Sequence, residues 1–166
     1  LTFQHPFSVK GSRERTQVAP DLRFELFASE PNIGKPIAFA WDERGRCWVA
    51  ETRDYPHNIQ PDGLGNDRIT ICEDTDGDGK ADKFTVFADK LNIPTSLVFA
   101  NGGVIVAQSP RFLFLKDTNG DDRADERREL MTGWGIRDTH AQANSFHYGH
   151  DNWIYGCVGY SGFDGE

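Results

Sequence analysis

Two short segments gather carboxylates at a spacing that suits a hard metal ion. Residues 74–82 read DTDGDGKAD and residues 117–125 read DTNGDDRAD, so each holds four Asp within nine positions. Crowded carboxylates repel one another unless water or a cation neutralises them. Side chains at positions 1, 3 and 5 of such a loop can face a calcium ion, and Gly allows the sharp turn. Both segments therefore predict a structural calcium site.

The predicted ligands follow from their positions in each loop. In the first loop they are Asp74, Asp76, Asp78, Lys80 and Asp82, and in the second loop they are Asp117, Asn119, Asp121, Arg123 and Asp125. Lys80 and Arg123 stand where only the backbone carbonyl contributes. Thr85 replaces the Glu that closes an EF-hand loop, so Asp82 is expected to close the first site. The sixth residue of the second loop is Asp122 rather than Gly, which predicts a strained or weaker site. A solvated Asp/Gly turn without metal is the alternative for both segments.

Three β-hairpin signatures surround these loops. Residues 37–51, 96–108 and 144–157 each read as strand, tight polar or Gly turn, and strand. Aligning Cys47, Val104 and Trp153 gives offsets of 57 and 49 residues. These offsets are close to the roughly 40–50 residues of a four-stranded propeller blade. Further strands are expected at residues 22–27, 68–72, 84–88, 112–116 and 126–131.

The pattern predicts an all-β chain that forms the N-terminal half of a six- or seven-bladed β-propeller, with calcium loops between outer strands. Residues 1–20 are expected to form an N-terminal arm. Residues 21–166 then supply a leading strand, two full blades and the start of a third. On this interpretation the chain begins a ring that it does not complete. A complete small β domain is the alternative.

Composition excludes several function classes. The net charge of −8 argues against nucleic-acid binding. No apolar run approaches the ~20 residues of a membrane span, so none is expected in this segment. The chain has no CxxCH motif and therefore no predicted haem site. Cys47 and Cys157 lie in apolar strand-like runs and are predicted to be buried thiols.

The connections at the end of the strands away from the Asp loops are rich in groups able to do chemistry. They are residues 51–67, 90–95, 133–143 and the segment from 159 onward, and they include Arg53, Asp54, Tyr55, Arg137 and Tyr160. His140 directly precedes the third hairpin and is expected to act as a general base, oriented by Asp138. A histidine hydrogen-bonded within a turn is the alternative. Both calcium sites should be structural, because they lie at the opposite end.

Three blocks of sequence carry a resemblance to a known family. WDERGRCWVAETRDYP, EDTDGDGKADKFTVFAD and DTHAQANSFHYGHDNWIYGCVGYSG together resemble the N-terminal propeller of the planctomycete and verrucomicrobial membrane-bound dehydrogenase-like proteins. These are also described as haem-binding CxxCH proteins of those bacteria. More distantly, the chain resembles soluble glucose and sorbosone dehydrogenases, which are propellers that use pyrroloquinoline quinone (PQQ).

The resemblance implies a catalytic role for His140. In those quinoproteins a catalytic His precedes an inner strand with a G-x-D turn, which Gly149-His150-Asp151 matches here. His140 is then the base for hydride transfer to PQQ, and Arg53 and Arg137 are candidates to pair with PQQ carboxylates. A periplasmic or cell-surface location, a sugar or alcohol substrate, and downstream domains of the same protein as partners are likewise implied.

Three function classes follow. The first is the calcium-stabilised propeller portion of an exported sugar or alcohol dehydrogenase-like quinoprotein, inactive as this segment alone. The second is a non-catalytic propeller that binds a carbohydrate or a protein partner. The third is a structural scaffold for a multidomain surface protein. Fold resemblance does not choose among them.

Overall fold

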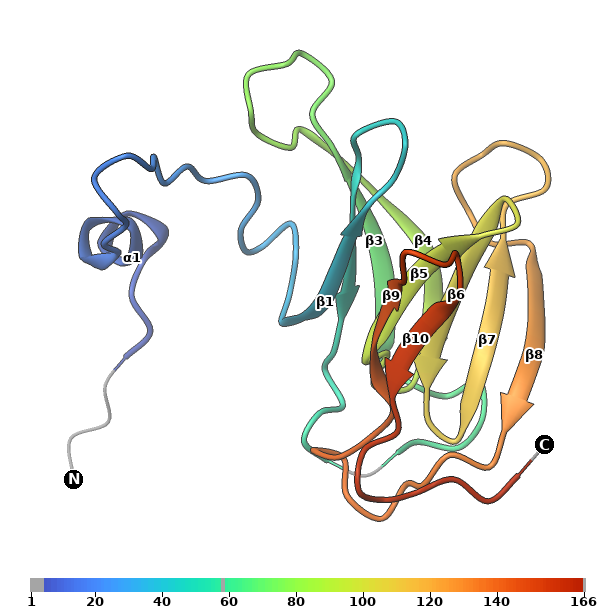
Figure 1. The fold of residues 1–166 in the computed structure, drawn as a ribbon. Helices are drawn as coiled ribbons and strands as arrows, with labels where there is room; N and C mark the ends of the chain where they lie inside the picture. Colours follow the sequence, from blue (N-terminus) through green and yellow to red (C-terminus); the bar gives the residue numbers. More distant parts are fainter. Residues whose placement is uncertain (1–4, 58, 166) are drawn as a thin grey trace.

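The computed structural model describes residues 5–57 and 59–165. Residues 1–4, Asn58 and Glu166, which fall within the predicted arm, the 51–67 connection and the main domain, lie outside the described residues. The N-terminal segment carries a short helix, α1 (Val9–Arg15), which begins after Ser8, whose Oγ accepts the Gly11 N–H at 3.1 Å. No residue of α1 is buried, and the segment extends away from the strands (Figure 1).

The remaining elements form three antiparallel sheets (Figure 1). The first sheet has the order β1 (Pro36–Trp41), β2 (Cys47–Glu51), β3 (Asp67–Glu73) and β4 (Lys83–Leu91). The second has the order β5 (Ser96–Ala100), β6 (Gly103–Gln108), β7 (Arg111–Lys116) and β8 (Glu126–Thr132). The third pairs β9 (Asn144–Tyr148) with β10 (Ile154–Cys157).

Local sequence explains the hairpins. Apolar residues fill both strands, with Leu97 and Val98 of β5 and Val104 and Val106 of β6 buried, and a two-residue turn joins the strands between Ala100 and Gly103. The turn residues Asn101 and Gly102 have φ values of 50° and 71°. Positive φ at both central positions is typical of a type I′ turn, in which Asn-Gly is the favoured pair. The strand register and the Asn-Gly turn are therefore both those of a two-residue β-hairpin.

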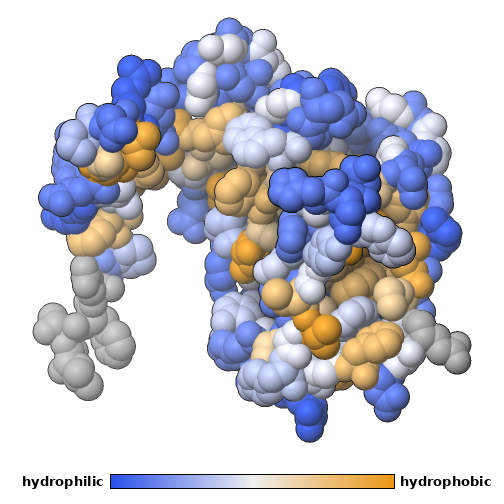
Figure 2. Space-filling model, in the orientation of Figure 1, coloured by the Kyte–Doolittle hydropathy of each residue, from blue (hydrophilic) through white to orange (hydrophobic). Residues whose placement is uncertain are grey.

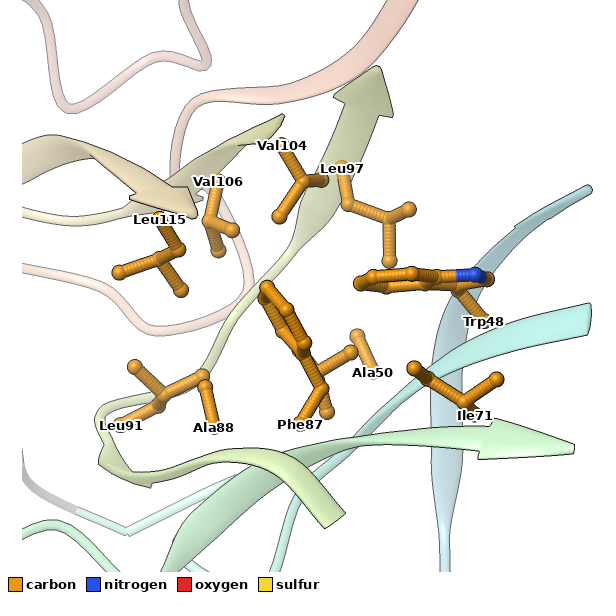
Figure 3. Close-up of a cluster of buried hydrophobic side chains, with 11 residues drawn as sticks. Trp48, Ala50, Ile71, Phe87, Ala88, Leu91, Leu97, Val104, Val106 and Leu115 are labelled. Carbon is orange, nitrogen blue, oxygen red and sulfur yellow. The ribbon is translucent and has the colours of Figure 1, made fainter. Parts of the chain in front are cut away.

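The main core lies between the first and second sheets (Figure 3). Trp48 contacts Phe87 and Phe99 edge-on, with ring centroids 4.4 and 5.1 Å apart. Val104 and Leu115 are fully buried on the facing sheet. Each such side chain contributes about 1.5–3 kcal/mol when it leaves water, so this layer fixes how the two sheets face each other.

A second aromatic layer joins the second and third sheets. Phe112 stacks on Trp134 with ring centroids 4.2 Å apart and meets Phe146 of β9 edge-on at 4.9 Å. Ala107 and Ala143 complete this cluster. The third sheet is thus held to the second through β9, and β10 forms its outer edge.

The predicted all-β class and the strand positions within each repeat are confirmed, but the propeller is wrong. Among the described residues the structure has three separate sheets of four, four and two strands, none of them closed into a barrel, and two four-stranded sheets do not make a six- or seven-bladed ring. The repeat spacing reports the size of the sheet unit and carries no information on ring closure.

Two smaller predictions are also wrong. Residues 22–27 form no strand, and Leu22 and Phe24 are exposed, because this alternating segment pairs with no neighbouring strand. Cys157 is exposed on the outer strand β10, whereas Cys47 is buried as predicted. Cys72, directly opposite Cys47, is buried too, and desolvation raises the pKa values of Cys47 and Cys72 to about 11 and about 12.

The connections gather at two ends of the strands. The Asp loops lie at one end, and the connections after β2, β4, β6, β8 and β10 lie at the other (Figure 1). Figure 2 shows hydrophilic residues over the Asp-loop end and hydrophobic residues interspersed among them toward the opposite end. Within the described residues, no helix has the length and apolar character needed to span a membrane.

Candidate functional site

The first Asp loop joins β3 to β4 and brings three carboxylates together. Oxygen atoms of Asp74, Asp76 and Asp78 all lie within 4.8 Å of one another. Asp74 organises the turn, because its two oxygens accept the N–H groups of Gly77 and Gly79, each at 2.8 Å. Gly77 and Gly79 have φ values of 79° and 86°, which glycine adopts without strain.

The second Asp loop joins β7 to β8 and repeats this scheme 43 residues later. Asp117 accepts the N–H groups of Gly120 at 2.7 Å and Asp122 at 2.8 Å. Asn119 accepts the N–H of Asp121 at 3.0 Å, as Asp76 accepts that of Asp78 in the first loop at 3.2 Å. The two loops therefore share one turn geometry, with a side-chain oxygen at each of the first, third and fifth positions.

The expected closing residues have local partners. Asp82 accepts the Thr75 hydroxyl at 2.8 Å, and Asp125 accepts the Thr118 hydroxyl at 2.9 Å. The cluster of mutually close ligand atoms in the first loop does not include Asp82. Asp82 therefore links the two ends of its loop through its hydrogen bond to Thr75.

Two further predicted positions lie close to the clusters. The Lys80 N–H donates to Asp78 at 2.8 Å, and the Arg123 N–H donates to Asp121 at 3.0 Å. The Lys80 ammonium also pairs with Asp78 at 3.0 Å, with both side chains exposed to solvent. Thr85, at the twelfth position, is paired with Ile71 inside the sheet and so belongs to strand rather than loop.

The carboxylate at the head of each loop is held ionised by the turn itself. The pKa of Asp74 lies below its usual value, chiefly because the Gly79 N–H donates to it, with further help from Gly77. Desolvation acts to raise the pKa of Asp117, but hydrogen bonds from the N–H groups of Gly120 and Asp122 outweigh it and lower the pKa. Both side chains therefore carry negative charge at neutral pH.

These residues fit a calcium ion. Calcium takes six to eight oxygen ligands at about 2.3–2.6 Å and tolerates irregular geometry. The first loop offers three carboxylates in one cluster, and backbone carbonyls and water can complete such a set. The second loop offers two carboxylates and one amide oxygen at the same positions. The donor set suits a hard cation and lacks the nitrogen and sulfur ligands that zinc prefers.

Asp122 has a role that the sequence did not reveal. Its φ is 63°, and its carboxylate receives the Arg46 guanidinium at 2.6 Å. Arg46 comes from the β1–β2 hairpin and also pairs with Asp42 at 2.8 Å. Asp42 in addition accepts the Trp48 indole N–H at 2.9 Å and the backbone N–H groups of Arg44 and Arg46. The Arg46 and Asp42 side chains are only 8% and 4% exposed. The second loop is therefore anchored to the first sheet.

The opposite end holds the predicted catalytic pair. Asp138 accepts the His140 N–H at 2.8 Å and contacts the ring Nδ1 at 3.0 Å. The Tyr160 hydroxyl donates to the second oxygen of Asp138. The Tyr55 ring meets the His140 ring edge-on, with centroids 5.1 Å apart. The structure thus brings His140 and Asp138 together as predicted and adds two tyrosines that the spacing alone did not associate with them.

The pKa of Asp138 is lowered to about 2. The largest cause is the Tyr160 hydrogen bond, followed by the bonds from the backbone and ring of His140. The same contact raises the pKa of Tyr160. Asp138 is therefore a carboxylate at neutral pH and orients the exposed imidazole through Nδ1, which leaves Nε2 as the other ring nitrogen able to exchange a proton.

A hollow of ≈ 280 Å³ lies beside His140, with Tyr55, Thr95 and Asn144 among its lining residues. Arg53 and Arg137 are exposed, and neither lines this hollow. Its volume is below the roughly 300–1,000 Å³ of typical ligand pockets. The hollow is therefore too small for the tricyclic PQQ. Arg53 and Arg137 stay predictions for that cofactor.

Asp54, singled out in the sequence, is buried and structural. Its carboxylate accepts the N–H of Asn66 at 2.9 Å. The neighbouring Asp67, which is 1% exposed, accepts the Asp54 N–H at 3.0 Å, the Thr52 hydroxyl at 2.9 Å and the Ile93 N–H at 2.6 Å. These bonds connect the long segment after β2 to the turn after β4. Ile93 of that turn lines the hollow beside His140.

Comparison with known proteins gives one match. The family model described as "Domain of unknown function (DUF7133)" matches residues 8–166. No curated protein and no solved structure matches the chain.

Proposed function

Because the chain belongs to the family described as "Domain of unknown function (DUF7133)", we propose a function from its own geometry: a β domain stabilised by two calcium ions, one in each Asp loop. The supporting observation is the repeated hydrogen-bond scheme of residues 74–82 and 117–125, which holds a side-chain oxygen at the same three positions of both turns.

The role of the ions is structural. Each loop closes a pair of adjacent strands at the sheet edge, β3–β4 or β7–β8. Both lie at the end of the strands opposite the β8–β9 connection (Figure 1), which carries His140. The ions neutralise crowded carboxylates there and favour the folded turns. Neither loop has a bidentate Glu at position 12, so we expect weak affinity of the kind found in extracellular modules, with Kd about 10⁻⁴–10⁻³ M. This agrees with the proposed exported location.

Thermal unfolding with calcium or chelator tests the proposal. At a calcium concentration near 100 times Kd, each ion adds about 2.7 kcal/mol, and each kcal/mol raises Tm by about 2–4 °C for a chain of this size. Asp76→Asn keeps the acceptor for the turn but removes one charge, which makes the first loop resemble the second. This variant should lose part of the calcium-dependent rise and keep its Tm in chelator. An identical Tm with calcium and with chelator in the wild type would exclude the proposal.

A second candidate function is proton transfer at His140. We propose that His140, held by Asp138, accepts the hydroxyl proton of a small sugar or alcohol in a dehydrogenase-like protein. The observation that favours it is the contact of Asp138 with both His140 and Tyr160 beside a hollow. The resemblance assigns the hydride to PQQ, and the proposal here is confined to the proton step.

The dye-coupled oxidation of sugars and alcohols by the full-length protein, supplied with calcium and with PQQ as the hydride acceptor, tests this second candidate. His140→Ala should abolish the activity. Tyr160→Phe should raise the pKa of Asp138, measured from its carboxyl ¹³C shift, whereas Tyr155→Phe should leave it unchanged because Tyr155 pairs with Asp151 instead. Activity that survives His140→Ala would exclude His140 as the base. An absence of activity in the wild type would favour a domain that binds a carbohydrate or a protein partner without catalysis.

A further inference from the structure

A second hollow lies at the same end as His140 but shares no lining residue with the first. Its volume is ≈ 410 Å³, within the usual range for small-molecule sites. It lies between the long connection after β2 and the tight turn from β6 to β7. Gln108 and Ser109 belong to that turn and line the hollow, together with Pro110 and Ile136.

Ser109 shows that this hollow has unused hydrogen-bonding capacity. Ser109 is 0% exposed, and its hydroxyl has no hydrogen-bond partner among residues 5–57 and 59–165. Buried hydroxyls are almost always paired with protein or with another molecule. Within the same described residues, the other buried unpaired side-chain groups belong to Trp134, Gln142 and Ser161, all in connections of this end. The Asp-loop end has no such group among the residues described.

Gln108 adds donors beside that hydroxyl. Its Oε1 accepts the Asn92 N–H at 2.9 Å, which fixes the orientation of the amide and leaves the NH₂ group to face another partner. Asn92 is itself held in place, since its Oδ1 accepts the Gln60 N–H at 2.9 Å and its Nδ2 donates to the Gln60 carbonyl at 3.2 Å. The amide of Gln108 is thus preorganised as a donor.

The charge around the hollow favours a neutral ligand. Arg111 at its edge is already paired with Asp62 at 3.0 Å and Glu129 at 2.5 Å. Two carboxylates against one guanidinium leave a net negative surrounding, which disfavours anions. Pro110 and Ile136 offer apolar surface to carbon atoms.

We propose that this hollow binds a neutral polyol, with Ser109 exchanging hydrogen bonds with one hydroxyl and Gln108 donating to another. A polyol both donates and accepts, so it matches a serine hydroxyl beside an amide NH₂, and its C–H groups can rest on Pro110 and Ile136. The site is separate from His140 and from the Asp loops, so it does not depend on the function proposed above.

Backbone and side-chain amide NMR of the calcium-loaded chain, titrated with sorbitol, tests the site. The amide signals of Asn92, Gln108 and Ile136 should shift in a saturable manner, while those of Thr95 and Asn144 beside His140 should not. Ser109→Ala should weaken binding about tenfold, as expected for one buried hydrogen bond. Gln108→Glu keeps the acceptor for Asn92 but removes the NH₂ donors, and should weaken binding similarly. Ser12→Ala, in the exposed helix, is the matched control and should bind as the wild type does.

Three results would overturn the proposal. One is an absence of saturable shifts at high millimolar sorbitol. Another is wild-type affinity in both Ser109→Ala and Gln108→Glu, which would mean that a water molecule alone pairs with the hydroxyl. The third is tighter binding of gluconate than of sorbitol at the same amide signals, which would contradict the neutral character of the site.

Discussion

The two Asp loops share one turn geometry but differ in how they are attached to the protein. In the first loop the sixth residue is Gly79, and a Cβ added there would meet nothing within 4 Å. In the second loop the sixth residue is Asp122, whose carboxylate pairs with Arg46 of the first sheet. The first loop is held through the Ala81 N–H, which donates to the Phe27 carbonyl at 2.9 Å, whereas the second loop joins two sheets through Asp122.

This difference changes the meaning of the substitution at the sixth position. A non-glycine residue with positive φ costs about 1–2 kcal/mol in the left-handed region, which led to the prediction of a strained or weaker site. Asp122 offsets that cost by neutralising Arg46, a cation that is largely buried. The second loop thus contributes to packing whether or not it holds an ion.

The largest expected effect comes from removing the anchor of the second loop. Arg46→Ala leaves Asp42 buried without its cation and frees Asp122, so we expect a loss of about 3–5 kcal/mol in the free energy of unfolding. Urea denaturation measures this. Arg44→Ala is the control, because its guanidinium is 58% exposed and lies 3.7 Å or more from its partners; it should change stability by less than about 1 kcal/mol. Equal losses in the two variants would contradict the anchoring role.

A smaller effect is expected from the first loop. Gly79→Ala meets no steric barrier, so its cost comes from the positive φ alone and should be about 1–2 kcal/mol. Lys80→Ala, at the next and exposed position, should stay within about 0.5 kcal/mol. Urea denaturation in chelator separates this backbone effect from any loss of calcium. If Gly79→Ala were neutral, the turn would not need the conformation described for it.

The smallest expected effect is the acid response of the loops. The pKa values of Asp74 and Asp117 are lowered in the folded protein, so each favours the fold above the unfolded pKa near 3.9 and loses that contribution as the pH falls through the lower folded pKa. Asp74→Asn and Asp117→Asn should each flatten the decline of Tm below about pH 4. Unchanged acid profiles in both variants would mean that these turns contribute nothing through charge.

Much of the local structure could be predicted from the sequence. The hairpins at residues 37–51, 96–108 and 144–157 are present because alternation and turn residues agree over a few positions. Residues 22–27 alternate equally well but form no strand, although the Phe27 carbonyl accepts the Ala81 N–H at 2.9 Å. A strand also needs a neighbouring strand, which alternation does not supply. The number and closure of sheets likewise depend on packing between distant segments, so the propeller prediction was wrong.

The candidate sites divide in the same way. Asp138 and His140 are two residues apart, and their contact was predictable from that spacing. Tyr160 lies 22 residues from Asp138, and Arg46 lies 76 residues from Asp122, so no local pattern pointed to either contact. The calcium ligands, PQQ and the dehydrogenase activity stay predictions.

The most direct test of the account is a calorimetric titration of calcium into chelator-treated protein. We expect two calcium ions bound per chain, with the site of three carboxylates at residues 74–82 binding more tightly than the site at residues 117–125. Asp76→Asn together with Asn119→Asp should reverse that order. If no calcium binds at millimolar concentration, the loops are solvated turns without metal and the central claim is wrong.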